Sequence, residues 1–292
     1  GVADLVARTV GKALAERLGQ PVVIDNRPGA GGIVAGQIVA TAAPDGSMLL
    51  LLSNGTAVSQ GLFARLPYDA RKDFVPVSML GQFDLAVIVP AASPFASLAQ
   101  LLEFARREPG KLNVATVSIG STQHLAAELL RMAAGVDFQV VPFTGTPAVL
   151  GALGGGHVDM AVEILAPMLP QIEAGVLRAL AVMGAARSQA LADVPTVAES
   201  ARANGSDSSP GLVDFDVSSW NALAAPAGTP PAIVGRLNRE LRQVLESGAV
   251  RDSLARLTVQ ARASSPEELA RLLDSEIRRW RDVIARAGIP LQ

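Results

Sequence analysis

The sequence has 292 residues, of which 49% are hydrophobic and 18% charged, and its formal net charge is −2. This length suits two domains, and the composition allows large buried cores and excludes a disordered chain. The charge provides no basic field for nucleic acid or an anionic membrane surface. The absence of cysteine excludes disulfides and thiolate chemistry, and two histidines are too few for a histidine-rich metal site. We therefore expect neither a cofactor nor a bound metal.

The N-terminal region shows no targeting segment. No apolar run approaches the roughly 20 residues that span a membrane, and no signal peptide is visible. The chain opens with Gly1-Val2-Ala3-Asp4, which is typical of a helix start. We expect a chain that has been processed or shortened at this end.

Short apolar runs alternate with helical patterns along the first three quarters of the chain. Strands are expected at residues 22–24, 48–52, 85–89, 113–117, 139–141, 160–162, 179–183 and 221–225. Helices are expected at residues 5–18, 33–43, 98–107, 122–134 and 147–153, each followed by glycine or proline. Because strands buried on both faces give continuous apolar runs, this alternation predicts open α/β sheets with parallel strands covered by helices.

The C-terminal region is helical. Thr229 is expected to cap a helix that carries prolines in its first turn and runs to residue 247, followed by a shorter helix at 250–257. The segment 265–268 is a capping box that opens the last helix. That helix carries an apolar stripe, which faces either the core or a partner: Leu269, Leu272, Leu273, Ile277, Trp280 and Ile284. The polar, Gly/Ser-rich stretch at 201–216 is expected to be a surface loop.

Two motifs suggest catalytic or nucleotide chemistry only weakly. The glycine-rich segment 27–32 follows an expected strand, but Val34 replaces the third glycine of a dinucleotide-binding motif and no acidic residue follows at the usual spacing. Ser121 and His124 lie one helical turn apart, but a third triad member and a nucleophile elbow are missing. We therefore expect no enzymatic activity.

An anion site is a better interpretation of the segment 118–122. It joins a buried strand to a helix N-terminus, where unpaired N–H groups and the positive end of the helix dipole attract carboxylates. Gly120 would let the backbone approach a ligand closely, and the segment 53–56 has a similar composition after an earlier strand. Ordinary helix capping remains the alternative. Glu163 follows an apolar strand and either meets a ligand ammonium group or is a plain surface acid.

Several blocks in the same order resemble one known family. They are the segments 17–32, 43–46, 66–69, 72–74, 109–113, 120–124, 193–196 and 225–230. The resemblance that these blocks carry extends over nearly the whole chain. They resemble the Bug (TctC-type) receptors, the periplasmic solute-binding proteins of tripartite tricarboxylate transporters.

The resemblance implies an α/β, two-lobed periplasmic-binding-protein (Venus-flytrap) fold of type II-like topology. Lobe 1 would comprise residues 1–95 and 225–292, and lobe 2 residues 96–224, with crossover strands between them. The protein would be a monomeric, non-catalytic periplasmic receptor that closes over a small carboxylate: an amino acid, a di- or tricarboxylate or a pyridine carboxylate. Its partners would be that ligand and the membrane subunits of the transporter.

The resemblance also implies which residues bind the ligand, through backbone N–H groups and hydroxyls instead of an arginine. These candidates are Asp4, Ser53, Asn54, Ser118, Gly120, Ser121, Thr122, Thr144, Glu163 and Ser219. The chain departs from the family pattern where Phe143 and Thr144 replace the usual Tyr and Lys. It also lacks the strand and P-G-G-x-x-D loop with which relatives begin, so one jaw of the site would be missing before Asp4.

Two other functions fit the same architecture. A ligand-sensing periplasmic subunit would use the same closure and pass its closed form to a signalling partner. An enzyme on the bilobal fold would need a nucleophile or an acid–base pair, for which the chain offers few residues.

Overall fold

The computed structural model describes residues 2–27, 32–203 and 210–292. The described chain forms two compact units. Unit 1 comprises Gly1–Gln82 and Trp220–Gln292, and unit 2 comprises Phe83–Ser219. The divisions fall inside the two strands β2 (Phe74–Pro90) and β7 (Ser218–Pro226). The boundaries predicted from the sequence lie instead at residue 95, in the loop after β2, and at residue 225, near the end of β7.

Unit 2 is built around a mixed sheet. Its strands are β3 (Asn113–Val117), β4 (Gln139–Phe143), β5 (Met160–Ile164), β6 (Leu177–Val182) and the second half of β2. β3 lies between β4 and β5 and is parallel to both, whereas β2 is antiparallel to β5 and to β6. The expectation of an all-parallel sheet was therefore wrong at β2. A strand buried on both faces gives a continuous apolar run in either direction, so its pattern does not report its orientation.

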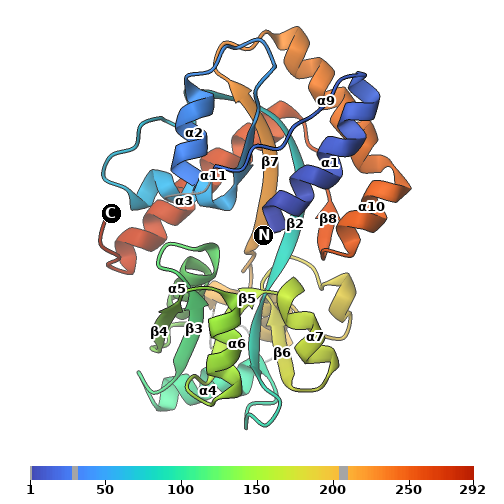
Figure 1. Ribbon diagram of the computed structural model, residues 1–292. Coiled ribbons are helices and arrows are strands. Elements are labelled where there is room, and N and C mark those ends of the chain that lie inside the picture. Colours follow the sequence, from blue (N-terminus) through green and yellow to red (C-terminus); the bar gives the residue numbers. More distant parts are fainter. Residues whose placement is uncertain (1, 28–31, 204–209) are drawn as a thin grey trace. The chain divides into compact units, whose positions relative to one another are not determined.

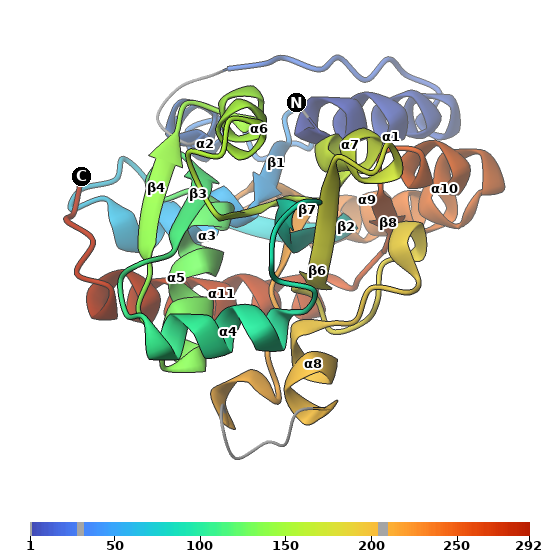
Figure 2. The same ribbon diagram turned by 90° about the horizontal axis from the view of Figure 1, so that it is seen from below.

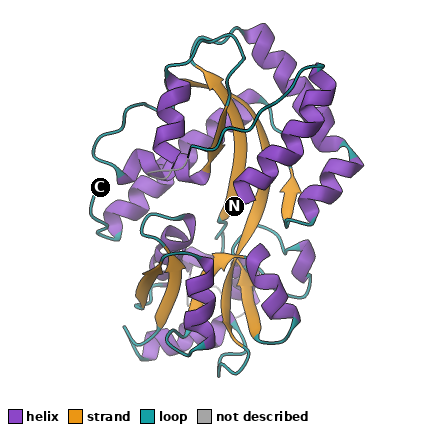
Figure 3. Cartoon of the chain, in the orientation of Figure 1, coloured by secondary structure: helices purple, strands orange, loops and turns teal. Residues whose placement is uncertain are grey.

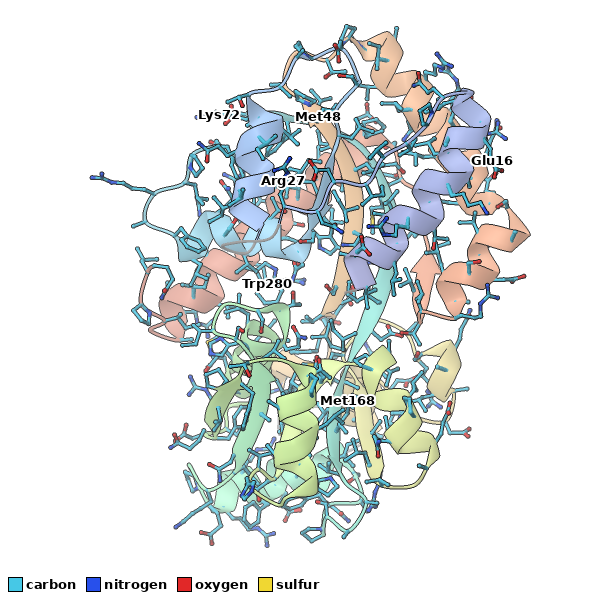
Figure 4. The ribbon with its side chains drawn as sticks, in the orientation of Figure 1. Glu16, Arg27, Met48, Lys72, Met168 and Trp280 are labelled. Atoms are coloured by element: carbon cyan, nitrogen blue, oxygen red, sulfur yellow. The ribbon has the colours of Figure 1, made fainter. Side chains whose placement is uncertain are left out.

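Helices cover both faces of this sheet, as Figure 2 shows. α6 (Thr146–Gly154) and α7 (Leu169–Glu173) lie on one side, and α4 (Leu98–Arg107) and α5 (Thr122–Ala134) lie on the other. The α6 face is filled by apolar side chains of both layers, including Ile88, Ala161 and Met168, which is labelled in Figure 4. The unit also contains α8 (Val197–Ala203) and the short 3-10 helices η2 (Ala166–Met168), η3 (Gln189–Leu191) and η5 (Pro210–Leu212).

Unit 1 holds the two ends of the chain (Figure 1). Its strands are β1 (Leu50–Ser53), β8 (Val259–Ala261) and parts of β2 and β7; β7 lies between β1 and β2, and β8 pairs with β2. Its helices are α1 (Val2–Leu18), α2 (Ile33–Ala40), α3 (Asn54–Leu62), α9 (Pro231–Glu246), α10 (Gly248–Ala255) and α11 (Pro266–Arg286). None of the helices in the described part of the chain is both long enough and apolar enough to cross a membrane.

The last helix, α11, contributes its apolar stripe to the core of unit 1. Its capping box is present, because the Ser265 side chain accepts from Glu268 N–H at 3.1 Å and Glu268 accepts from Ser265 N–H at 2.7 Å. Leu269, Ile277 and Trp280 are fully or almost fully buried, and α11 packs against α3. Trp280, labelled in Figure 4, donates from Nε1 to Asn54 Oδ1 at 2.8 Å. The core interpretation of the stripe is confirmed.

The expected strand at 22–24 was wrong. This segment pairs with no strand in the described ranges of the chain and is drawn as loop in Figure 3. The side chains of Val22 and Ile24 pack over Gly11 of α1, where an added Cβ would lie 3.2 and 3.3 Å from them, and Val23 points outward with 83% of its surface exposed. The apolar residues are therefore buried by a helix and not by a sheet.

The expected cap at Thr229 was also wrong. The cap residue of α9 is Pro230, and the Thr229 hydroxyl donates to Pro226 O at 2.7 Å within the preceding turn. The helix begins one residue too late for Thr229 to reach its first N–H groups. Residues 28–31 of the glycine-rich segment and residues 204–209 of the expected loop at 201–216 lie outside the described residues. In the described part of that loop, residues 201–203 are the end of α8 and Pro210–Leu212 form η5, so the loop prediction was wrong there.

Candidate functional site: a helix N-terminus at the sheet edge of unit 2

Three parallel strands of unit 2 end at the same edge of the sheet. β3 leads into α5 and β4 leads into α6, and these two helices lie on opposite faces (Figure 2). Val117 and Phe143, the last residues of the two strands, are paired, and Ser118 N–H donates to Phe143 O at 2.9 Å. Neighbouring strands whose following helices diverge mark the point where open α/β sheets bind ligands.

The turn 118–121 has a fixed backbone. Ser121 N–H donates to Ser118 O at 3.0 Å, and Gly120 adopts φ +77°, a left-handed conformation that favours glycine. The Ser121 hydroxyl donates to Val117 O at 2.7 Å and accepts from His124 N–H at 3.0 Å. Ser121 is therefore the N-cap of α5, and its hydroxyl is engaged by the chain itself. A ligand would be held by the backbone of this turn and not by the Ser121 side chain.

The first turn of α5 offers donors to an anion. The N–H groups of Gly120 and Gln123 have no hydrogen-bond partner within the described residues. α5 has 13 residues, so its N-terminus carries the partial positive charge of a helix dipole. Gly120 and Thr122 are half-buried, and Ser118 is exposed. This geometry suits a carboxylate, since such a group accepts several N–H bonds at once.

The second helix start lies beside the first in the sheet. Gly145 is the N-cap residue of α6, and Thr146 and Pro147 form its first turn. Thr144, one of the predicted ligand residues, is exposed at this turn. The sheet therefore brings Thr144 to the same edge as the turn 118–121.

Glu163, near the end of β5, is fully buried, with 0% of its surface exposed. Its Oε1 accepts from Gln123 Nε2 at 2.6 Å and from Ile164 N–H at 2.7 Å, and its Oε2 accepts from the Thr146 hydroxyl at 3.1 Å. Burial raises the pKa of this carboxyl, and these three hydrogen bonds oppose the rise. The surface-acid alternative was wrong, and the buried position gives no support to a contact with a ligand ammonium group.

His124 does not form a catalytic pair with Ser121, because the two residues meet only through the backbone N–H of His124. The imidazole is buried, and its Nδ1 has no partner in the part of the chain that the structure describes. Burial holds the pKa of His124 below its usual range despite nearby Glu128. No group of three or more metal-binding side chains occurs in the described ranges of the chain.

The other predicted residues belong to different surroundings. Ser219, the last residue of unit 2, is buried on β7. Asp4 lies in unit 1, in the first turn of α1; hydrogen bonds from Arg8 and then Asn26 hold its pKa below the ordinary value.

Ser53 and Asn54 also lie in unit 1, at the junction of β1 and α3. Ser53 N–H donates to the Thr56 hydroxyl at 3.3 Å, and the buried Asn54 side chain is engaged by Trp280. Both residues therefore stabilise the start of α3.

Sequence reasoning missed Gln123 and Thr146. Both lie in the first turns of helices, where the sequence pattern indicates backbone donors but no particular side chain. Their common partner, Glu163, lies 40 and 17 residues further along the chain. The one signal in the sequence was Glu163, an acid at the end of an apolar strand. If that strand is central in a sheet, the acid is buried and needs hydrogen-bond donors.

Comparisons with known proteins agree with this architecture. Residues 6–289 match the family model described as "Tripartite tricarboxylate transporter family receptor". The chain is 35% identical to the protein BugT of Bordetella pertussis over 295 residues, with 100% of this chain and 87% of BugT covered.

Two solved structures from Rhodopseudomonas palustris are similar over almost the whole chain. Rpa4515 with adipate has a TM-score of 0.81 and 32% identity, covering 99% of this chain and 94% of that one. MatC with bound malate has a TM-score of 0.76 and 35% identity, covering 97% and 94%. The chain belongs to the TctC (Bug) family of tripartite tricarboxylate transporter receptors.

Proposed function

We propose that this protein is a periplasmic receptor that binds a small carboxylate and delivers it to a tripartite transporter in the membrane, without chemical change. The observation that carries the proposal is the N-terminus of α5, where the Gly120 and Gln123 N–H groups lack partners in the described chain. The family match supports the receptor role, and the adipate and malate held by two relatives support the ligand class.

The ligand carboxylate would lie on the backbone of the turn 118–122, with Gly120 allowing close approach. Thr144, at the neighbouring turn, is placed to offer a hydroxyl. Since Glu163 is buried and bonded within unit 2, it gives no reason to prefer a ligand with an amine over a plain dicarboxylate. Malate and adipate are therefore the first probes.

A thermal-shift panel tests this function. Malate, adipate, citrate, glutamate and nicotinate are compared with the neutral diamides of malic and adipic acid, which keep the carbon skeleton and lose the charge. A ligand at 100 times its Kd stabilises the folded protein by about 2.7 kcal/mol. We expect a shift with at least one carboxylate and none with the matching amide. No shift with any carboxylate, or equal shifts with acid and amide, would overturn the proposal.

Absence of turnover and delivery to the membrane need separate measurements. Mass spectrometry of the ligand recovered after prolonged incubation should show the unchanged molecule, and a modified product would identify an enzyme. Reconstituted transporter subunits should take up labelled ligand only in the presence of the receptor. Binding to a signalling protein in place of uptake would instead favour a sensor.

A further inference from the structure

Glu163 is a buried carboxyl group whose hydrogen-bond donors among the described residues are all neutral. The amide of Gln123, the N–H of Ile164 and the hydroxyl of Thr146 reach its two oxygens at 2.6, 2.7 and 3.1 Å. Its neighbour on the same face of β5, Ala161, belongs to the apolar core under α6. A buried carboxylate normally has a cationic partner, because removing its charge from water is costly.

No cation faces Glu163 within the described part of unit 2. The elements β3, β4 and α6 contain no charged residue. The charged residues on the other elements that pack on β5 are occupied elsewhere: on α5, Arg131 pairs with Glu128 at 2.8 Å, and His124 is a buried ring influenced by Glu128. On β2, Asp84 is bonded to Ser188, and at the far end of β5 Asp159 accepts from Asn113 N–H at 2.7 Å.

The carboxyl group lies directly behind the proposed anion site. Gln123 belongs to both, since its backbone N–H faces the first turn of α5 while its side chain donates to Glu163. Thr146 likewise lies in the first turn of α6, and its hydroxyl donates to Glu163. The positive ends of both helices therefore act on Glu163, and a ligand carboxylate would compete with it for the same positive potential. Two carboxylates that share a site cannot both ionise without a penalty.

We propose that Glu163 takes up a proton from solvent when a ligand carboxylate binds at the α5 N-terminus, so that it sets the affinity for anions from behind the site. This inference rests on the proposed function. In the ionised state Thr146 donates its hydroxyl hydrogen to Glu163 Oε2. In the protonated state the Oε2 hydrogen is donated to Thr146 Oγ1, and the Thr146 hydroxyl hydrogen is released for another acceptor. Burial, which already raises the pKa of Glu163, favours the same state.

The substitution Glu163→Gln imitates the protonated state. Its amide oxygen can still accept from Gln123 and Ile164, and its NH₂ group can donate to Thr146 Oγ1. Asp84→Asn is the matched control, because Asp84 is also a buried acid of unit 2 whose pKa is raised by burial, but its partner is Ser188. Both substitutions remove one buried carboxyl group with little change of volume.

Calorimetry of malate or adipate binding, in two buffers with different heats of ionisation, measures proton uptake directly. For the wild type and Asp84→Asn we expect uptake of a fraction of a proton when the ligand binds. Their affinity for the ligand should therefore fall as the pH rises, by at most about tenfold per pH unit, which is the limit for one linked proton. Glu163→Gln should bind without this uptake, and at neutral pH more tightly than the wild type. The ligand's own titration affects all three proteins equally and cancels in the comparison.

The outcomes separate the two proposals. If the proteins bind carboxylates but the wild type takes up no more protons than Glu163→Gln, the Glu163 proposal is overturned and the receptor function stands. Weaker binding by Glu163→Gln, above all of glutamate, would identify Glu163 as a direct contact and overturn it as well. If no carboxylate binds to any of the proteins, the proposed function itself fails.

A stability measurement checks the ionisation of Glu163 without ligand. Burial raises the pKa of Glu163 in the folded state above its value in the unfolded state. As the pH rises from the unfolded-state pKa to the folded-state pKa, the wild type therefore loses stability, and Glu163→Gln does not. The melting temperature of Glu163→Gln relative to the wild type should therefore increase from acid to neutral pH. A difference that stays constant over this range would mean that Glu163 has the same pKa in the folded and unfolded states, which would contradict the buried, proton-favouring environment from which the proposal is argued.

Discussion

Two glycines at opposite ends of α5 allow the ligand site to be tested apart from stability. Gly120 precedes the helix with φ +77°, and Gly135 ends it with φ +61°. A Cβ at Gly135 would meet no atom within 4 Å, so an alanine there adds conformational strain and no steric contact. The substitutions Gly120→Ala and Gly135→Ala therefore both impose the backbone strain of a left-handed alanine, and only the first changes the proposed carboxylate site.

The expected magnitudes follow from backbone sterics. A left-handed alanine costs about 1–2 kcal/mol, and each kcal/mol lowers the melting temperature of a domain of this size by roughly 2–4 °C. Both variants should therefore lose about 2–8 °C. Gly120→Ala should also displace a backbone N–H from the ligand, and a hydrogen bond to a charged group contributes about 1.5–3 kcal/mol. This corresponds to a loss of affinity of about 10- to 100-fold.

The assay is thermal denaturation of each variant, followed by titration calorimetry with the carboxylate that binds the wild type. Gly135→Ala should keep the wild-type affinity while it loses stability. The reasoning is refuted if Gly120→Ala binds as tightly as Gly135→Ala at a similar melting temperature, because the turn 118–122 would then not hold the ligand.

Two further predictions concern unit 1. Trp280→Phe should lower the free energy of unfolding by about 1–3 kcal/mol more than Trp220→Phe. The reason is that Trp280 Nε1 donates to two side chains, whereas Trp220 Nε1 is buried with no partner among the described residues. Urea denaturation measures both losses, and equal losses would contradict this. Thr258→Gly should raise stability by about 1 kcal/mol in the same assay, since Thr258 adopts φ +52°, and a loss of stability would show that its side chain matters more than this strain.

The sequence predicted most elements of unit 2 because local signals mark their ends. α4 and α5 occupy the expected residues, with a serine N-cap at each start and a left-handed glycine, Gly135, after α5. The segment 118–122 was also expected at a helix N-terminus, and it lies there. Because helix capping and helix termination depend on a few adjacent residues, they can be predicted from the sequence without knowledge of the fold.

Features that depend on distant partners were not predictable. The apolar segment 22–24 packs on a helix, and the antiparallel direction of β2 is fixed by its neighbours in the sheet. The environment of Glu163 depends on side chains from two helices that only the folded sheet brings together. Its raised pKa likewise follows from burial, which a strand pattern does not reveal.

The most direct measurement is a crystal structure of the protein with the carboxylate that gives the largest thermal shift. The account predicts a ligand carboxylate oxygen within about 3 Å of the backbone nitrogens of Gly120 and Gln123, with no arginine side chain on that carboxylate. A carboxylate held by an arginine, or bound away from the α5 N-terminus, would contradict it.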